Sequence, residues 1–235
     1  MLASSAVVDV VSRSGIDFVI IDLEHGSISM ETAEDMVRAA QNQSCQPIIR
    51  VGDSQENSIL HALETGCEAV LVPHVSTAAA ARTIVQAARY APLGSRGISA
   101  YTRCHGYSHE NLETSLDRHA KDTLVGVLVE GTEGLRNLEG IAQVPGLDII
   151  YLGLFDLSQS LGVPGRIHDT AVISELSRCV DIITKNGLAA GTVTDDPSSA
   201  KELRQLGVQF IAYAADSYGL REFFRRAVEQ AAIHA

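Results

Sequence analysis

The feature that most constrains the fold of this chain is a regular alternation of short apolar runs with longer helical patterns. The runs are rich in Val, Ile and Leu, and the segments between them repeat Ala, Glu and Arg at helical spacing. Continuous apolar runs are typical of strands that are covered on both faces, and helices between successive strands are the crossovers that parallel pairing requires. The alternation therefore predicts an α/β fold around a parallel sheet.

Seven runs predict seven strands: Phe18–Glu24, Pro47–Val51, Ala69–Val75, Leu124–Glu130, Ile149–Gly153, Leu188–Val193 and Phe210–Asp216. The segments between them predict helices at Met30–Gln41, Asn57–Thr65, Thr77–Tyr90, Asn111–Lys121, Leu135–Gln143, Thr170–Asn186 and Pro197–Leu206, and Tyr218–Ile233 predicts a closing helix. The residues before Phe18 have helical rather than strand spacing. Because a (β/α)8 barrel has eight strands, we expect one barrel, or one open doubly wound sheet, in which the first barrel strand is missing.

The composition fits a single folded domain over residues 1–235. Hydrophobic residues make up 46% and charged residues 20%, and the formal net charge is −11. That charge argues against a phosphate-binding nucleic-acid surface and against an anionic membrane as partners. The apolar runs are far shorter than the ~20 residues of a membrane span, and the N-terminus lacks the pattern of a secretory signal. We therefore expect a cytoplasmic protein.

The four cysteines, Cys45, Cys67, Cys104 and Cys179, are widely spaced and contain no C-x-x-C pair. This spacing argues against a thiolate metal site or a redox centre. We expect reduced, mostly buried thiols.

Charged residues gather where the predicted strands end. In a barrel or an open α/β sheet, the carboxyl ends of the strands form the rim on which sites are built. The residues at these ends are Asp22, Glu24, His25, Arg50, His74, Glu130, Asp156, Thr192 and Asp216. Carboxylates, a histidine and an arginine on one rim can supply oxygen ligands for a divalent ion, a general base and a cation for a developing oxyanion.

Five ordered motifs extend this pattern: FVIIDLEHG at 18–26, PIIR at 47–50, LVP at 71–73, APLGSRG at 91–97 and YLGLFDLS at 151–158. Together they resemble the HpcH/HpaI class II aldolase family, among the phosphoenolpyruvate/pyruvate-type barrels, from about Val7 to the C-terminus. The resemblance implies a (β/α)8 TIM barrel that uses a divalent metal, Mg²⁺, Mn²⁺ or Co²⁺, to form the enolate of pyruvate. The enolate is added to an aldehyde, or released from one.

The resemblance also implies roles for individual residues. Glu130 and Asp156 are expected to be the metal ligands, His25 with Asp22 behind it the catalytic base pair, and Arg50 the group that faces the 2-oxo acid. The remaining expected substrate contacts are Gly153, Leu154, Phe155, Arg103 and Glu64.

Several of these residues also have an ordinary structural reading. A strand-end His25 that is hydrogen-bonded to a carboxylate can have a purely structural role. Glu24 either orients water or the metal ligands, or is a carboxylate with an ordinary hydrogen-bonding role. Glu64 matches an acidic family position near the aldehyde, yet an acid that ends a surface helix is common. In the loop Ser99–Tyr107, Arg103 or His105 could bind a distal carboxylate or phosphate, although most such loops are solvated surface.

Two departures from the family pattern lie close to the expected site. Leu128 stands where the common aldolases carry a pyruvate-binding Gln, and Phe155 stands where a small residue is typical. Three functions stay open: a metal-dependent 2-oxo-acid aldolase, a citrate-synthase-like enzyme that condenses an acyl thioester with oxaloacetate, and a non-catalytic member that binds a 2-oxo acid. Retention of Asp22, His25 and Arg50 with both expected ligands argues against the third.

The resemblance further implies a homo-oligomer, a trimer or a hexamer, in which the closing helix is exchanged with a neighbouring subunit. The apolar residues of that helix, Leu220, Phe223, Phe224, Ala227 and Val228, fit packing on a neighbour and equally fit packing on its own barrel.

Overall fold

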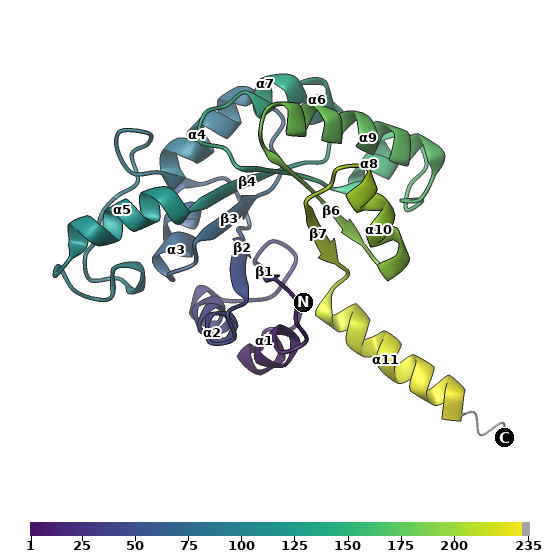
Figure 1. Cartoon of the computed structure of the whole chain (residues 1–235), viewed down its shortest axis with the longest axis horizontal. Coiled ribbons are helices and arrows are strands. Elements are labelled where there is room, and N and C mark those ends of the chain that lie inside the picture. Colours follow the sequence, from purple (N-terminus) through teal and green to yellow (C-terminus); the bar gives the residue numbers. More distant parts are fainter. Residues whose placement is uncertain (232–235) are drawn as a thin grey trace.

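In the computed structural model, which describes residues 1–231, seven parallel strands form a nearly closed barrel with helices around its outside (Figure 1). Each strand pairs with the next one along the chain. The strands are β1 (Phe18–Asp22), β2 (Gln46–Arg50), β3 (Ala69–Val72), β4 (Leu124–Val129), β5 (Ile149–Leu152), β6 (Ala189–Thr194) and β7 (Phe210–Tyr213). The predicted strands are thus confirmed, and all but β6 stop short of their predicted carboxyl ends.

The edges of the sheet, β1 and β7, face each other across the position that an eighth strand would fill. The rings of Phe18 and Phe210 stack there, with centroids 4.3 Å apart, so side chains rather than backbone hydrogen bonds join the two edges. Within residues 1–231, no strand precedes β1, as predicted; the helix α1 (Ser5–Ser12) stands there instead. Before α1, the terminal amine of Met1 forms an ion pair with Asp216.

Side chains alternate between the two faces of each strand, which separates the core into two parts. On the outer face, the strands pack against the surrounding helices in the larger core. On the inner face, a smaller cluster fills the barrel: Phe18, Ile20, Ile48, Ala69, Leu71, Leu128, Ile149, Tyr151 and Phe210. The inward positions that follow this cluster along β1, β2 and β4 are polar, and they form the rim described below.

The helices follow the predicted order. They are α2 (Met30–Gln41), α3 (Glu56–Glu64), α4 (Ala78–Ala88), α5 (Leu112–Asp122), α6 (Thr132–Arg136), α7 (Leu138–Ala142), α8 (Leu154–Ser160), α9 (Thr170–Lys185), α10 (Pro197–Gln205) and α11 (Asp216–Ala231), with a 3-10 turn η1 (Arg103–His105). Ser29 caps α2 through its side chain. The single helix predicted over Leu135–Gln143 is wrong, because the chain forms two short helices, α6 and α7, on either side of Asn137.

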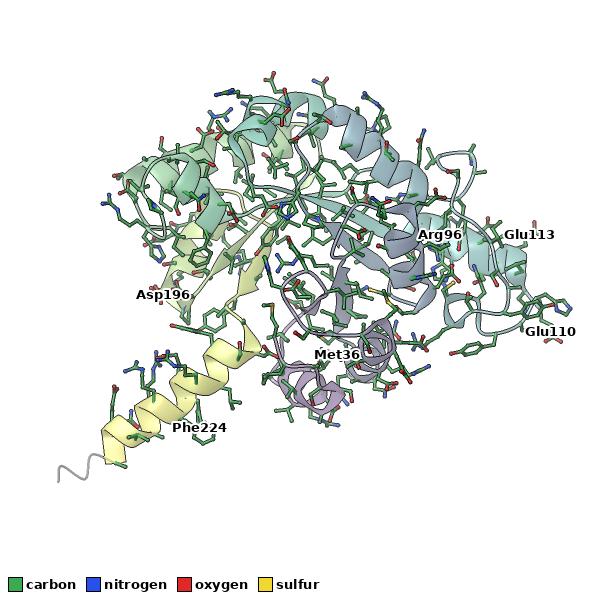
Figure 2. All side chains as sticks on the ribbon, turned by 180° about the vertical axis from the view of Figure 1, so that it is seen from behind. Met36, Arg96, Glu110, Glu113, Asp196 and Phe224 are labelled. Atoms are coloured by element: carbon green, nitrogen blue, oxygen red, sulfur yellow. The ribbon has the colours of Figure 1, made fainter. Side chains whose placement is uncertain are left out.

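The last helix, α11, extends away from the barrel (Figure 1), and Figure 2 shows Phe224 on its free length. None of its described residues is buried, and Leu220, Phe223, Phe224 and Val228 are exposed. Packing of this helix on its own barrel is therefore not what the structure shows. The predicted helix end, Ile233, lies outside the described residues.

Two further expectations can be compared with the described residues. All four cysteines are free and buried, as predicted. Among the helices of residues 1–231, none combines the length and the apolar character needed to span a membrane.

Candidate active site

The polar rim begins with a salt bridge between the ends of β1 and β2. Asp22 and Arg50 are register partners on adjacent strands, so their side chains point to the same side of the sheet. The guanidinium donates through Nε and Nη2 to the two carboxylate oxygens of Asp22, over 2.7 and 2.6 Å. Burial alone would raise the pKa of Asp22, but the hydrogen bond and the charge of Arg50 outweigh it and hold the pKa below its ordinary value.

The chain beyond β1 is held by the same carboxylate. Oδ1 of Asp22 also accepts the backbone N–H groups of Glu24 and His25, at 3.1 and 3.3 Å. The predicted base pair required the ring of His25 to contact Asp22, and the ring lies beside Glu24 instead. Its Nε2 lies 3.9 Å from Oε2 of Glu24, and the side chain is 65% exposed. The Asp22 carboxylate binds Arg50 rather than this ring, and the catalytic role of His25 and Asp22 stays a prediction.

His74 connects two carboxylates across the rim. Its Nε2 lies 2.8 Å from Oε1 of Glu24, its Nδ1 lies 2.8 Å from Oε1 of Glu130, and its backbone N–H donates to the same Glu130 oxygen. His74 has φ of 59°, in the left-handed region that side chains other than glycine seldom adopt. This backbone turn brings both the N–H and the ring of His74 to the rim. The sequence had already placed His74 among the strand-end residues.

Glu130 and Asp156 meet at Gly153, which lies between β5 and α8. A Cβ atom on Gly153 would lie 3.1 Å from Oε2 of Glu130 and 3.8 Å from Oδ2 of Asp156, so this position leaves little room for a side chain. Glu130 is therefore brought beside the first turn of α8, which carries Asp156. This juxtaposition agrees with the expected ligand pair.

The donor set on this rim suits a hard divalent cation. Burial raises the pKa of Glu130; the hydrogen bond and the charge of His74 oppose this shift, and repulsion from Asp156 and Glu24 adds to it. Oε2 of Glu24 is buried and accepts no hydrogen bond among the described residues, although Nη1 of Arg50 lies 3.3 Å from it. Crowded carboxylate oxygens of this kind are relieved by a bound cation, and oxygen ligands are those that Mg²⁺ and Mn²⁺ prefer.

Two residues form the floor below these acids. Leu128 and Tyr151 each lie two positions before a rim residue, Glu130 and Gly153 respectively, and they are register partners. Residues two apart on a strand share a face, so both side chains point into the barrel. Leu128 is fully buried there. Leu128 was expected near the site and Tyr151 was not, although the period of two that places Leu128 on the inner face also places Tyr151 there.

The residues after Gly153 divide between core and surface. The side chain of Leu154 is buried in the outer core, and the expected substrate contact at this position stays a prediction. Phe155 is 56% exposed, so its ring is not part of the packed interior. The other strand-end residues also have structural partners: Thr192 donates to the carbonyl of Leu152, and Asp216 binds the N-terminus.

Glu64 and Arg103, both expected to contact the substrate, lie elsewhere in this chain. Glu64 ends α3, which leads into the amino end of β3, and its carboxylate binds Arg96 at 2.8 Å. Arg103 donates to the carbonyl of Thr65, directly after α3, and to the side chain of Gln41. Guanidinium groups are drawn to the free carbonyls of helix C-termini. Neither side chain reaches the carboxyl-end rim of its own barrel, and the expected substrate contacts of both residues stay predictions.

The loop around η1 is also not a substrate mouth. A buried cluster near η1 contains three residues of the kinds that bind metal ions, Cys104, His105 and His119. The histidine ring nitrogens already have protein partners: His105 bonds to Tyr90 and Ser115, and His119 bonds to the carbonyl of Cys104. The Arg96 guanidinium lies 3.6 Å from the Cys104 sulfur, which disfavours a cation. His105 is therefore part of a buried network, and its side chain is neither solvated nor free to bind an anion in this structure.

Comparison with known proteins gives a consistent result over nearly the whole chain. Residues 1–222 match the family described as HpcH/HpaI aldolase/citrate lyase. A 2-keto-3-deoxy-L-rhamnonate aldolase of Salmonella gallinarum (strain 287/91 / NCTC 13346) is 30% identical over 214 residues, 91% of this chain and 80% of that protein. A hydroxypyruvate/pyruvate aldolase of Roseobacter denitrificans (strain ATCC 33942 / OCh 114) is 32% identical over 217 residues, 92% of this chain and 84% of that protein.

Solved structures agree in fold. An HpcH/HpaI aldolase/citrate lyase family protein of Burkholderia cenocepacia J2315 superposes with a TM-score of 0.91 at 26% identity, covering 98% of this chain and 91% of that one. A citrate synthase, SbnG, superposes with a TM-score of 0.88 at 28% identity, covering 98% and 89%.

Proposed function

The chain belongs to the HpcH/HpaI aldolase/citrate lyase family, and on this premise we propose that it is a divalent-metal-dependent carbon–carbon lyase that forms or cleaves a 2-oxo acid through the enolate of pyruvate. The aldolases among its relatives support this activity. The substrate class is a 2-oxo-3-deoxy or 4-hydroxy-2-oxo acid, which yields pyruvate and an aldehyde. The observation that carries the proposal is the set of converging carboxylates Glu24, Glu130 and Asp156 beside the Asp22–Arg50 salt bridge.

Glu130 and Asp156 are the residues that we propose hold the cation, with Mg²⁺ or Mn²⁺ as the first choices and Co²⁺ as a third. A bound divalent ion would polarise the ketone of the 2-oxo acid and stabilise negative charge on its oxygen. The two carboxylates leave other coordination positions free for the substrate and water.

Arg50 binds the 2-oxo acid in this proposal. Nη1 of Arg50 lies 3.3 Å from Glu24, while Nε and Nη2 are held by Asp22, so the guanidinium plane is fixed at the rim. A cation that is already oriented stabilises developing negative charge without reorganisation during the reaction. Asp22 is thus a positioning residue for Arg50 and for the turn that carries His25.

His25 is the proposed proton carrier. In the cleavage direction, a base takes the proton of the C4 hydroxyl, the C3–C4 bond breaks to release the aldehyde, and the electron pair stays on pyruvate as the enolate, which takes up a proton at C3. The exposed ring of His25 lies beside Glu24, where a substrate entering from solvent would meet it. An imidazole has a pKa suited to taking and returning protons near neutral pH.

The test is pyruvate release from a panel of hydroxy-2-oxo acids with Mg²⁺, Mn²⁺ or Co²⁺, before and after chelation. We expect turnover that is lost on chelation and restored by the ion, and that falls by about 10²-fold or more in Glu130→Ala and in His25→Ala. Full activity in either variant would refute the assignment of that residue.

A second candidate is condensation of an acyl thioester with oxaloacetate, favoured by the structural likeness to the citrate synthase SbnG. In that reaction the thioester forms the nucleophile and the 2-oxo acid is the electrophile. Thiol release from acetyl-CoA with oxaloacetate, in the absence of pyruvate release from the panel, would favour this candidate over the aldolase.

We also propose a cytoplasmic homo-oligomer, a trimer or hexamer, in which α11 packs against a second copy of the chain. The exposed apolar side chains of α11 support this, since they form no buried packing within their own described chain.

A further inference from the structure

The floor of the site contains one polar side chain, that of Tyr151. Its ring packs edge-on against Phe210, with centroids 5.9 Å apart, and its register partner Leu128 is aliphatic. The neighbouring inward positions Ile20, Ile48 and Leu71 are aliphatic too. A hydrogen bond from the floor to a bound ligand can therefore come only from the Tyr151 hydroxyl, among the inward side chains of this cluster.

The hydroxyl of Tyr151 is available for such a bond. The residue is 8% exposed, and within residues 1–231 its oxygen makes no hydrogen bond. The other largely buried tyrosine outside the site, Tyr90, behaves as expected of a buried phenol and bonds to His105 at 2.9 Å. The ring lies inside the barrel while the hydroxyl oxygen stays accessible, so a ligand oxygen placed above it can accept its hydrogen bond in place of water.

Arg50 shows where that ligand would lie. Arg50 is the inward position that follows Ile48 of this cluster along β2, so its side chain lies at the rim of the barrel that Tyr151 lines, and it is the group proposed above to face the 2-oxo acid. Burial raises the pKa of Tyr151 well above its ordinary value, so the phenol stays protonated and acts as a donor. Leu128, which could otherwise share this task, has no donor.

From this arrangement we infer that Tyr151 is a substrate-positioning residue, whose hydroxyl donates a hydrogen bond to an oxygen of the bound 2-oxo acid. The inference rests on the proposed function, since it assumes that a 2-oxo acid binds between Arg50 and the Glu130–Asp156 pair. It assigns to the floor of the barrel a specificity for ligands with an acceptor oxygen on the side away from solvent.

The test compares Tyr151→Phe with Tyr90→Phe by calorimetric titration of pyruvate and of oxalate in the presence of Mn²⁺, together with the Tm of each protein. Both variants keep the ring and lose one hydroxyl. Tyr151→Phe should weaken binding by about ten-fold and leave the Tm of the unliganded protein unchanged. Tyr90→Phe should lower the Tm, because it removes a bond within the protein, and should leave the affinity unchanged.

The outcomes separate this inference from the proposed function. If the wild-type protein binds neither pyruvate nor oxalate with Mn²⁺, the proposed function fails and the inference with it. If the wild-type protein binds them and Tyr151→Phe binds equally well, the role of Tyr151 alone is overturned. A rise in KM for the oxo acid with little change in kcat in Tyr151→Phe would support positioning.

Discussion

At the scale of single residues, the carboxylate of Asp22 holds the Arg50 guanidinium and two backbone amides of the turn that follows β1. The expected partner of this carboxylate was the ring of His25. Sequence spacing could place Asp22 and His25 on the same rim. Sequence spacing could not show which nearby basic side chain would bind the Asp22 carboxylate, because the choice depends on the register between β1 and β2.

The buried Asp22–Arg50 pair leads to a prediction about stability. Asp22→Asn should lower the free energy of unfolding near neutral pH by about 3 kcal/mol, because Arg50 loses its charged partner. The pKa of Asp22 is lowered from 3.8, so its contribution is complete above that pH and is lost as the pH falls through the lower, folded-state pKa.

Urea unfolding of both proteins from neutral to acid pH measures this effect, and the difference between them should shrink at the acid end. Asp9→Asn is the control, since Asp9 pairs with Arg13 on the surface. This substitution should change the free energy of unfolding by less than about 1 kcal/mol. A difference that stays constant down to the acid limit would contradict the account of Asp22.

The Glu130–Asp156 pair leads to a prediction about metal affinity. Glu130→Gln keeps the shape of the side chain and removes one anionic ligand, and we expect the affinity for Mn²⁺ to fall by about 100-fold or more. Glu64→Gln is a matched control on a carboxylate that lies away from the rim. Titration of Mn²⁺ followed by electron paramagnetic resonance measures the affinity of each variant. Equal affinities in the two variants would contradict the assignment of Glu130 as a metal ligand.

At the scale of elements, the sequence predicted the strands and most helices because continuous apolar runs and helical spacing are local signals. The strand ends were less predictable. The chain leaves the sheet at Asp22, Arg50 and Val72, where the following residues turn polar groups such as Glu24 and His74 toward the rim. The helix α8 was missed because it is short and follows its strand directly, at Gly153.

The two sheet edges give a prediction at this scale. The ring of Phe210 packs against Phe18 and Tyr151, so it fills the barrel where the strands are not hydrogen-bonded to each other. Phe210→Ala should lower the free energy of unfolding by about 3 kcal/mol or more. Leu93→Ala, in an exposed loop, should change it by less than about 0.5 kcal/mol. If chemical denaturation finds the two variants alike, the stacked rings do not close the barrel.

At the scale of the whole molecule, the sequence left two options open for the closing helix, and the structure shows it extended away from the barrel. The spacing of Leu220, Phe224 and Val228 predicted the apolar face of α11. The spacing did not predict the direction of the helix, because an amphipathic pattern does not identify the surface that covers the apolar face.

The proposed oligomer gives a prediction about mass. The protein should elute as a trimer or hexamer in size exclusion with light scattering, and Phe223→Glu with Phe224→Glu should shift it to smaller species, since buried charge opposes the contact. Arg221→Glu, on the same helix, tests for an effect of charge alone. A monomeric wild-type protein would contradict the proposal.

Exchange of the C3 protons of pyruvate with D2O, followed by proton NMR, tests the proposed enolate chemistry without any knowledge of the aldehyde. The wild-type protein should catalyse the exchange with Mg²⁺ or Mn²⁺ and lose it on chelation, and Glu130→Ala should slow it by about 10²-fold or more. Absence of exchange in the wild-type protein with each divalent ion, or exchange that persists in Glu130→Ala, would contradict the proposed metal-dependent enolate chemistry.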